Sequence, residues 1–511
     1  MLLIPASSLF LSAAFILFLI NKSRQKRAHL PPGPPGHPFI GHVLKIPTEN
    51  QDMALYKLGK TYGDVMYLEI FGRPIVVLNS VEAAIDLLDK RSANYSDRPH
   101  FPIFEHMGWR ETLTFTGYGK PFQKYRRLCQ EHLKSTKIIV YQPVQRQATR
   151  ILLQNLLSDD SLRNDWIRRF STSIIMRVAY GHQITSDDDP YLDITENTSF
   201  ALSNAGAPGN TPVDFFPFLQ NFPSWFPGAY YAGFARSQKG AIRKLHDYPF
   251  DNVKAELAAG TAKPSFVSHE LQSLSLDEAD NSSNILDIKG VAGVMYCAGA
   301  ETTWITLSVF FLAMVLHPEC QKRAQQEIDS VVGPGRLPDF SDREYLSYIE
   351  CILQETLRWN PGVPLGVPHR SLEDDIYRGM FIPKGSLVIG NTRGMALDEK
   401  VYADAQAFNP SRYLPLPEGN HEPYPHGPFG FGRRICPGRH LADASVWIAM
   451  ASILATFDIL KPIGSDGKEI TPEVKFSTGI TSQPSTFYCR IRPRNDQAKH
   501  IIIHADTSDN Y

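Results

Sequence analysis

The sequence lacks an excess of charge of either sign. Its 511 residues include 52 Lys and Arg against 53 Asp and Glu, for a formal net charge of −1. Proteins that bind nucleic acid usually concentrate positive charge, so this balance gives no reason to expect a nucleic-acid partner. With 43% hydrophobic and 21% charged residues, the composition is that of a globular chain rather than a disordered one.

Cysteine is also scarce, and no two cysteines form a C-x-x-C pair. Without such pairs a structural zinc site is not expected. A disulfide framework is not expected either, because these frameworks are typical of short, cysteine-rich secreted chains. We expect a reducing compartment in which most thiols are buried and inert and at most one has a function. The six candidates are Cys129, Cys297, Cys320, Cys351, Cys436 and Cys489.

Charged residues are missing from the apolar run Leu2–Ile20. A helix of this length would span about 28 Å, close to the ~30 Å hydrocarbon core of a bilayer. The basic segment NKSRQKR follows, and positive charge on that flank favours a cytoplasmic location for the rest of the chain. A cleaved signal peptide, the alternative, normally carries its positive charge before the apolar run. We therefore expect a single-pass transmembrane anchor in residues 1–21 and a basic, proline-rich strap in residues 22–36.

Beyond the strap the sequence shows no repeat and no second low-complexity linker, so residues 37–511 are expected to form a single domain. Helical periodicity dominates this stretch. The predicted fold is mainly α with small β-sheets, behind an N-terminal transmembrane helix. Four short runs of β-type residues are candidate strands: Val65–Ile70, Pro74–Leu78, Phe381–Ile389 and Phe476–Ile491.

Two predicted helices stand out. One covers Asp287–His317 and stops before Pro318, and its length of about 30 residues exceeds that of an average helix. Its most apolar part, Thr302–Leu316, is too short to cross a bilayer and adjoins Glu301, so we expect a buried central helix rather than a membrane span. The other is predicted over Arg343–Trp359, before a proline.

The most informative stretch is FGFGRRICPGRHLA, residues 429–442. Its glycines allow tight turns and a close approach of the backbone to a flat partner. Cys436 precedes a predicted helix, with Pro437 suited to the first helical position. Backbone N–H groups and the helix dipole would favour a thiolate there, and a thiolate is a suitable axial ligand for haem iron. A buried cysteine in a glycine-rich turn is the simpler alternative.

This stretch resembles the haem-binding signature of the cytochrome P-450 family, F-x-x-G-x-R-x-C-x-G. It matches at Phe429, Gly432, Arg434, Cys436 and Gly438. The resemblance implies a haem-thiolate monooxygenase that binds haem (heme b), with Cys436 as the iron ligand and Phe429, Arg434 and Gly438 around the cofactor. Such a thiolate donates electron density to the iron and favours O–O cleavage.

Two further segments resemble the family. Glu355 and Arg358 match its E-x-x-R, and residues three apart on a helix can pair. The later segment FNPSRY resembles F-x-P-x-R-F, with Ser411 in place of the usual acid. The resemblance implies that Arg412 joins Glu355 and Arg358 in a buried network with a structural role.

The long predicted helix contains AGAETT, residues 298–303, which resembles the family's oxygen-activation sequence A-G-x-D/E-T. Small Ala298 and Gly299 would let the helix pass close to the haem and open a local bulge. By resemblance, Thr302 assists oxygen activation and Glu301 helps supply protons from water. The alternative is a packing spot for small residues, but a buried glutamate without a role or partner would be costly.

Haem carries two propionates, which need cationic or donor groups. The family uses W-x-x-x-R on an early helix, and here Phe122 replaces the tryptophan while Arg126 is retained. The replacement removes an indole N–H donor. His369 and Arg434 are the other expected propionate partners, and Arg98 is a weaker candidate. For each of these residues except Arg434, a solvated surface position is the alternative.

The resemblance implies insertion of one oxygen atom from O2 into an apolar organic substrate. The sequence has no G-x-G-x-x-G fingerprint, so we expect NADPH to bind a separate NADPH–cytochrome P-450 reductase. One rival is a haem-thiolate isomerase or dehydratase, which usually lacks the helix threonine. The other rival is a non-enzymatic, membrane-tethered haem-binding protein. The catalytic domain would lie on the cytoplasmic side of the endoplasmic reticulum membrane.

The segment PLGVPHRSLEDDIYRGMFIPKG looks most like fungal members that serve secondary metabolism, such as relatives of O-methylsterigmatocystin oxidoreductase and tryptamine 4-monooxygenase. The expected pocket residues are mostly apolar, which favours a terpenoid, polyketide or aromatic alkaloid. They lie at 101–107, Met295, 363–367 and Ile480.

Basic residues recur at helical spacing between positions 120 and 127. With Arg126 turned inward, Lys120, Lys124 and Arg127 would form an outward basic face. The flavin domains of such reductases are typically acidic, so we expect this face to steer reductase docking. A solvated basic face without a partner is the alternative.

Overall fold

The computed structural model describes residues 29–505 except 111, 160, 163, 207–210 and 275–277, and only the backbone of 278–281. The expected anchor, residues 1–21, and the first part of the strap therefore lie outside the described residues. The remaining strap is packed on the domain: the Tyr67 N–H donates to the Pro32 carbonyl at 2.8 Å. A Cβ on Gly33 would lie 2.0 Å from the Tyr67 carbonyl oxygen, so only glycine fits this close approach.

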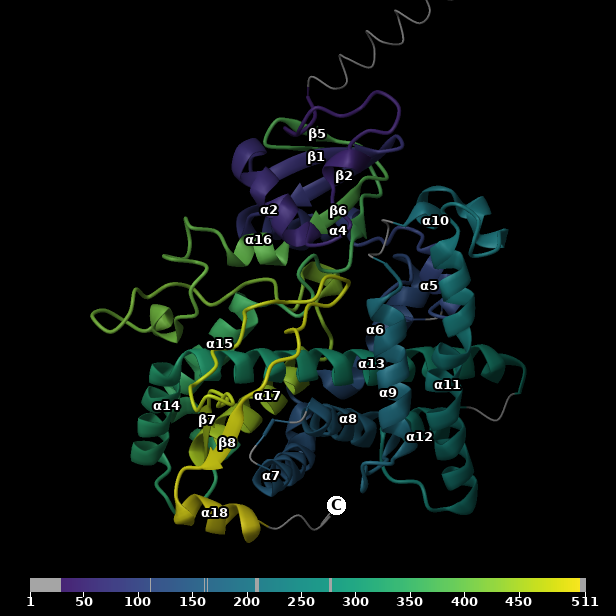
Figure 1. Ribbon diagram of the computed structural model, residues 1–511. Helices are drawn as coiled ribbons and strands as arrows, with labels where there is room; N and C mark the ends of the chain where they lie inside the picture. The colour runs from purple at the N-terminus through teal and green to yellow at the C-terminus, as the bar shows by residue number, and fades with distance from the viewer. Residues whose placement is uncertain are drawn as a thin grey trace, which may run out of the picture.

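A four-stranded sheet with the order β1-β2-β6-β3 forms one end of the molecule (Figure 1). β1 (Val65–Ile70) pairs antiparallel with β2 (Arg73–Leu78), which confirms the first two predicted strands. β6 (Leu387–Gly390) lies parallel to β2, and β3 (His369–Arg370) is antiparallel to β6. The sheet thereby fixes His369, an expected haem contact, opposite Val388.

The predicted strand Phe381–Ile389 is wrong as a single strand. β5 (Met380–Ile382) pairs with β4 (Asp375–Tyr377) in a separate two-stranded sheet. Gly385, with φ of 79°, then turns the chain before β6 begins. An apolar run marks burial, but it does not reveal the turn inside it.

The predicted strand Phe476–Ile491 is mostly irregular. Only its end is regular, where β8 (Arg490–Pro493) pairs with β7 (Phe457–Leu460). Phe476 contributes an isolated bridge to Pro484, and proline cannot donate to a continued ladder.

Helices form the larger part of the molecule, in agreement with the predicted mainly α fold (Figure 1). Those up to α10 are α2 (Gln51–Tyr62), α3 (Val81–Ala84), α4 (Ser92–Tyr95), α5 (Pro102–Met107), α6 (Lys120–Leu133), α7 (Gln142–Ser158), α8 (Asn164–Tyr180), α9 (Pro190–Ser203) and α10 (Pro212–Phe215). The later ones are α11 (Tyr230–Ala259), α12 (Phe266–Gln272), α13 (Glu278–Leu316), α14 (Pro318–Val331), α15 (Ser347–Trp359), α16 (Thr392–Ala396), α17 (Arg439–Thr456) and α18 (Asp496–Ile503).

α13 crosses the middle of the helical part and packs against α8, α11, α15 and α17 (Figure 1). Within the described part of the chain, its segment Ser282–Leu316 is the one helix long and apolar enough to cross a membrane. In the apolar 18-residue stretch of this helix, 78% of the residues are buried inside the protein, which confirms the predicted central helix. It ends before Pro318, as predicted, but begins earlier than the predicted Asp287.

The second predicted helix, Arg343–Trp359, is shorter than expected because α15 begins at Ser347. A 3-10 helix, η5 (Phe340–Tyr345), precedes it, and Leu346 between the two has a non-helical backbone. The Glu327 carboxylate of α14 accepts from the N–H groups of Tyr348 and Ile349 at 2.8 to 3.2 Å. A side chain from another helix therefore caps α15, a partner that local sequence does not reveal.

The predicted network around Glu355 is present and fully buried. Arg358 donates to both carboxylate oxygens of Glu355, at 2.7 and 2.8 Å. Arg412 donates to the same carboxylate at 3.1 Å, and the Tyr413 hydroxyl donates to it at 2.8 Å. Burial alone would raise the pKa of Glu355, but the bond from Arg358 and the charges of both arginines hold it below its ordinary value. The carboxylate is thus kept ionised between two guanidinium groups.

Candidate active site

Cys436 lies in a tight loop at the entrance to α17. Its backbone N–H donates to the Phe429 carbonyl at 2.8 Å, which closes the loop. Gly432 has φ of 54°, and a Cβ there would lie 2.0 Å from the Leu88 carbonyl oxygen. Phe431 is buried in the small core around β2 and β6, so the loop is anchored to the sheet end of the molecule. These contacts account for the glycine at position 432 of the motif.

The start of α17 differs from the prediction. Pro437 does not occupy the first helical position, because Gly438 is the N-cap residue and α17 begins at Arg439. Gly438 has an ordinary φ of −86°, so it is not there for a left-handed turn. A Cβ added to Gly438 would lie 4.0 Å from the Cys436 sulfur, an ordinary contact, so the free protein does not require glycine at this position.

Opposing influences act on the Cys436 thiol. Burial raises its pKa above the ordinary value. The backbone N–H groups of Gly438 and Arg439 and the charges of Arg126 and Arg439 act in the opposite direction. N–H groups and positive charge aimed at a buried sulfur are what a thiolate ligand requires. The donor set therefore fits a cysteine that holds a metal as thiolate.

Three arginines gather around this loop, and among the described residues no hydrogen bond or ion pair joins them to an acid. Arg434 donates to the carbonyls of Ser96, Leu113 and Thr116, and Arg98 donates to those of Thr114, Val367 and Pro368. Arg126 donates to the Ile435 carbonyl beside Cys436. The partners of these guanidinium groups are thus neutral carbonyls.

Burial strongly disfavours the charges of this arginine cluster. Burial and then the charge of Arg434 lower the pKa of Arg98 well below its ordinary value. Burial also lowers the pKa of Arg434, to about 10. Asp97 partly offsets this, but it already accepts from Arg370 at 2.7 Å and from the Tyr118 N–H at 2.6 Å. A buried excess of positive charge fits an anionic ligand such as the two propionates of haem.

Arg98, the weaker candidate in the sequence, lies in this cluster and is 7% exposed. The alternative of a solvated surface position is therefore wrong for Arg98. His369 is equally buried, and burial, followed by the charge of Arg98, lowers its pKa well below the ordinary value. Its Nδ1 lies 2.7 Å from the Tyr95 carbonyl, which can only accept, so Nδ1 carries a proton. Nε2 can then donate to an anion only if the ring becomes cationic, which a nearby anion would favour.

Phe122 replaces the expected tryptophan, and the structure shows what it contacts. Its ring lies under the Arg434 guanidinium, 3.7 Å from the guanidinium carbon to the ring centroid. The aromatic face stabilises the cation that the sequence motif places beside Cys436. Phe122 thus acts on the site through Arg434, a contact that the sequence pattern did not indicate.

Thr302 lies on the least buried face of α13. Ala298 is exposed, and Thr302 and Thr306, four and eight residues later, are half-buried, while most neighbouring residues are buried. The Thr302 hydroxyl donates to the Ala298 carbonyl at 2.9 Å. The expected bulge is not found, because α13 is continuous here. Gly299 instead allows α8 to approach, since a Cβ there would lie 2.8 Å from the Ile175 side chain.

Glu301 points from α13 toward α8 and α9. Its carboxylate accepts from the Ser199 hydroxyl and lies 3.8 Å from Nη1 of Arg168. Arg168 also stacks on Trp304, 3.7 Å from the ring centroid. Burial raises the pKa of Glu301, and Ser199 and Arg168 oppose that rise. No sequence pattern indicates Ser199 or Arg168, because only the packing of three helices brings them to Glu301.

The family model for cytochrome P-450 matches residues 31–489. Cytochrome P-450 monooxygenase 176 of Postia placenta is 38% identical, covering 98% of this chain and 96% of the relative. Cytochrome P-450 monooxygenase claR of Ampulloclitocybe clavipes is 39% identical, covering 95% and 90%. Cytochrome P-450 monooxygenase ple1 of Rhodocybe pseudopiperita is 37% identical, covering 96% and 94%.

Proposed function

Because this chain belongs to the cytochrome P-450 family and is a haem-thiolate monooxygenase, we propose that it oxidises an apolar organic substrate in fungal secondary metabolism. The observation that carries the assignment of the site is the Cys436 loop, where backbone N–H groups face the sulfur beside a buried arginine cluster whose charge Asp97 offsets only in part. The fungal origin of the relatives supports the biological setting.

The haem supplies oxygen binding and redox chemistry, and the residues around it hold the cofactor and manage protons. Cys436 is the proposed iron ligand, and Arg98, Arg126 and Arg434 are the proposed propionate partners, with His369 joining when cationic. Phe429 and Gly438 border the cysteine. Thr302 presents a hydroxyl on the least buried face of α13. Burial raises the pKa of Glu301, whose carboxylate lies toward α8 and α9 with Ser199 and Arg168, and Glu301 is proposed to take up and pass on a proton from that side of α13.

The substrate is proposed to be a terpenoid, polyketide or aromatic alkaloid. Among the residues expected near it, Phe104 of α5 and Met295 of α13 present apolar side chains and belong to the same hydrophobic cluster. NADPH and O2 consumption in step with product formation distinguishes this monooxygenase from its rivals. An isomerase or dehydratase would turn over without NADPH, and a haem-binding protein would consume neither reagent.

The proposed electron donor is an NADPH–cytochrome P-450 reductase, but the expected docking face needs correction. The Lys124 side chain is 42% exposed, but its charge is already paired, because its ammonium binds Asp287 and, at 2.6 Å, the Asn284 side chain of α13. Lys120 and Arg127 remain exposed. Charge reversal at these two residues should slow reduction by the reductase most at low salt, where screening is weakest. An unchanged rate with normal haem content would remove this face from the proposal.

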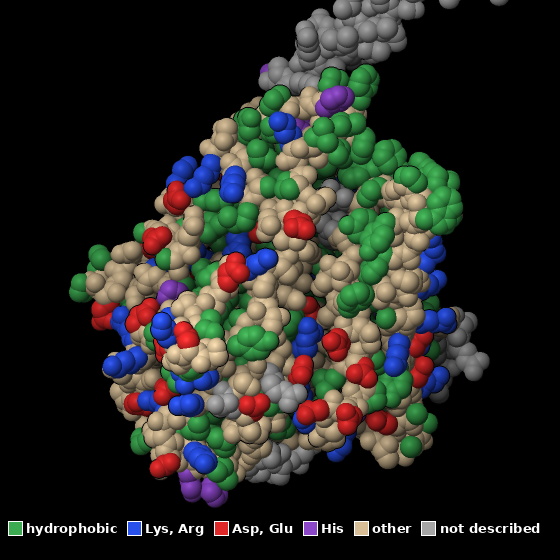
Figure 2. All heavy atoms as spheres, viewed as in Figure 1, with side chains coloured by type: hydrophobic (Ala, Val, Ile, Leu, Met, Phe, Trp, Pro, Cys, Tyr) green, Lys and Arg blue, Asp and Glu red, His purple; other side chains and the backbone are tan. Residues whose placement is uncertain are grey.

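An endoplasmic reticulum membrane anchor at residues 1–21 is also proposed. An apolar surface on the described domain supports it: Phe39, Leu44, Phe218 and Trp225 are all more than half exposed. Figure 2 shows hydrophobic side chains gathered over the sheet end and the adjoining α10 region. A patch of this kind is typical of membrane or protein contact.

Deletion of residues 1–29 tests the anchor directly. The shortened protein should lose most of its membrane association and keep its haem spectrum. Adding Trp225→Asp should release what remains bound to lipid vesicles. Loss of haem from the shortened protein would mean that the N-terminal segment belongs to the domain fold.

A further inference from the structure

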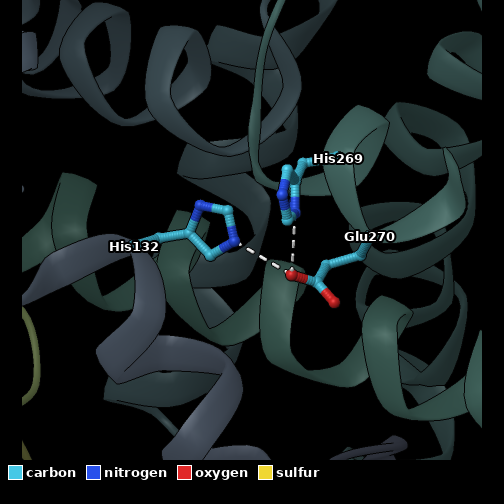
Figure 3. A group of neighbouring side chains, drawn as sticks. All are labelled: His132, His269 and Glu270. Atoms are coloured by element: carbon cyan, nitrogen blue, oxygen red, sulfur yellow. Dashed lines mark hydrogen bonds and ion pairs between the residues drawn. The ribbon is translucent and has the colours of Figure 1, made fainter. Parts of the chain in front are cut away.

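Three side chains of metal-ligating type meet between α6 and α12 (Figure 3). His132 lies in the last turn of α6, and His269 and Glu270 are neighbours on α12. Nε2 of His132 lies 2.9 Å from Oε1 of Glu270, and Nδ1 of His269 lies 3.3 Å from the same oxygen. One ligand atom from each residue lies within 4.8 Å of the other two. None of these residues belongs to the haem site described above.

Two imidazoles and one carboxylate form a ligand set that Zn²⁺ uses when its fourth position is held by water. In a tetrahedral zinc site with ordinary bond lengths, neighbouring ligand atoms lie about 3.3 Å apart. The two distances from Glu270, 2.9 and 3.3 Å, are already close to that value. We propose that His132, His269 and Glu270 bind one zinc ion.

The site is partly preorganised. The side chains of His132 and Glu270 are 13% and 9% exposed, so packing holds both. The His132 ring contacts buried Phe266 edge-on, with ring centroids 5.0 Å apart. The His269 side chain is 66% exposed, so it can rotate to bring its ligand atom to the required distance from the His132 ligand atom. Its exposure also leaves a path for the ion and its water. Two fixed ligands and one adjustable ligand require little rearrangement on binding.

Zinc at this site would tie α6 to α12. α6 also carries Arg126, which donates to the Ile435 carbonyl beside Cys436. The ion would therefore stabilise the helix that supports the cysteine loop, without touching the loop itself. The absence of C-x-x-C pairs bears only on cysteine-ligated zinc. The His132 and Glu270 ligands lie 138 residues apart, so no local motif reveals this site.

The experiment measures zinc per haem iron in the full-length holoprotein after equilibration with ZnCl2 and dialysis. All measurements start from the His500→Ala protein, called the background protein. This substitution removes a second histidine pair that could bind metal, because the rings of His500 and His504 stack with centroids 4.0 Å apart. We expect about one zinc per iron in this background, with a zinc-dependent rise in melting temperature. His269→Ala and Glu270→Gln should each weaken zinc binding at least about tenfold and abolish the rise.

Only variants with a normal haem spectrum are compared, because that spectrum shows that the domain has folded. His269→Ala changes an exposed side chain, so it decides the matter alone if Glu270→Gln fails to fold. A zinc-to-iron ratio near zero in the background protein would overturn the proposal. So would zinc binding that His269→Ala leaves unchanged, because the ion would then be bound elsewhere.

Discussion

Within the described part of the chain, the buried arginines around Glu355 and those around the cysteine loop differ in their partners. Arg358 and Arg412 share the carboxylate of Glu355, and Arg412 also binds Glu422 at 2.6 Å. In the second group, around the cysteine loop, Arg98 and Arg434 donate to backbone carbonyls. The first group is neutralised within the fold, whereas the second retains buried positive charge.

This difference separates a structural network from a ligand site. Buried ions paired with good geometry can be held by the protein alone, and removing one partner is strongly destabilising. Buried cations without an acid are unfavourable in the protein alone and become favourable when an anionic ligand binds. The same residue type therefore serves the fold in one place and, as proposed, the cofactor in the other.

The largest expected effect comes from breaking the neutralised group. Glu355→Gln leaves the buried Arg358 guanidinium without a carboxylate and Arg412 with Glu422 alone, so the free energy of unfolding should fall by about 3–5 kcal/mol. Denaturant unfolding measures it. In the wild type this contribution is present at neutral pH and is lost as pH falls through the lowered pKa of Glu355.

Glu418→Gln is the matched control for that experiment. Glu418 pairs with Arg323 at the surface, so its loss should change the free energy of unfolding by no more than about 1 kcal/mol. Equal effects of the two substitutions would contradict a structural role specific to the Glu355 network.

The next effect comes from the second group, around the cysteine loop. Arg434→Gln should fold with some loss of stability, because it removes a charge that is unfavourable to bury but leaves the carbonyls of Ser96, Leu113 and Thr116 without this donor. It should release haem to excess apomyoglobin roughly 10- to 150-fold faster, the loss expected for one charge-assisted hydrogen bond of about 1.5–3 kcal/mol. Arg393→Gln, which alters a buried arginine beside Asp52, should lower stability without this selective effect. Similar haem release in both variants would erase the distinction between the groups.

Glu301 lies between these two situations: it is a buried acid whose charged partner, Arg168, is 3.8 Å away rather than in a close ion pair. Burial raises the pKa of Glu301. The yield of product per NADPH should therefore stay constant at pH values where an ordinary carboxyl group is already ionised, and it should fall as the pH rises through the raised pKa of Glu301. Ser199→Ala removes a bond that lowers this pKa, so the falling limb should move to higher pH. Glu301→Gln should give a low yield of product per NADPH that does not fall further as the pH rises. A wild-type pH profile in Glu301→Gln would remove it from proton delivery.

The smallest effect is expected at Phe122, whose ring stacks on the Arg434 guanidinium. Phe122→Leu removes a cation–π contact worth about 0.5–2 kcal/mol and should speed haem release by a few-fold to about thirtyfold. Phe122→Trp keeps the stacking surface and adds an N–H donor, so haem release should be no faster than in the wild type. Faster release from the tryptophan variant would show that ring stacking is not what position 122 contributes.

The sequence predicted features whose partners are near in the chain or fixed by a motif. β1, the central helix and the Glu355–Arg358 pair all follow from local patterns. It did not predict contacts made by distant segments, such as Glu327 capping α15 or Ser199 bonding Glu301. It also misplaced the start of α17, because proline at a favourable position does not by itself begin a helix.

The central claim is that Cys436 is the thiolate ligand of the haem iron. Cys129 is the other thiol that acts on Arg126, and burial raises its pKa to about 12, so it is the matched control. The direct test is the absorption spectrum of the reduced protein with carbon monoxide. Cys129→Ala should keep the red-shifted Soret band that thiolate ligation produces, and Cys436→Ala should lose it. A Cys436→Ala protein that retains the band would contradict the account.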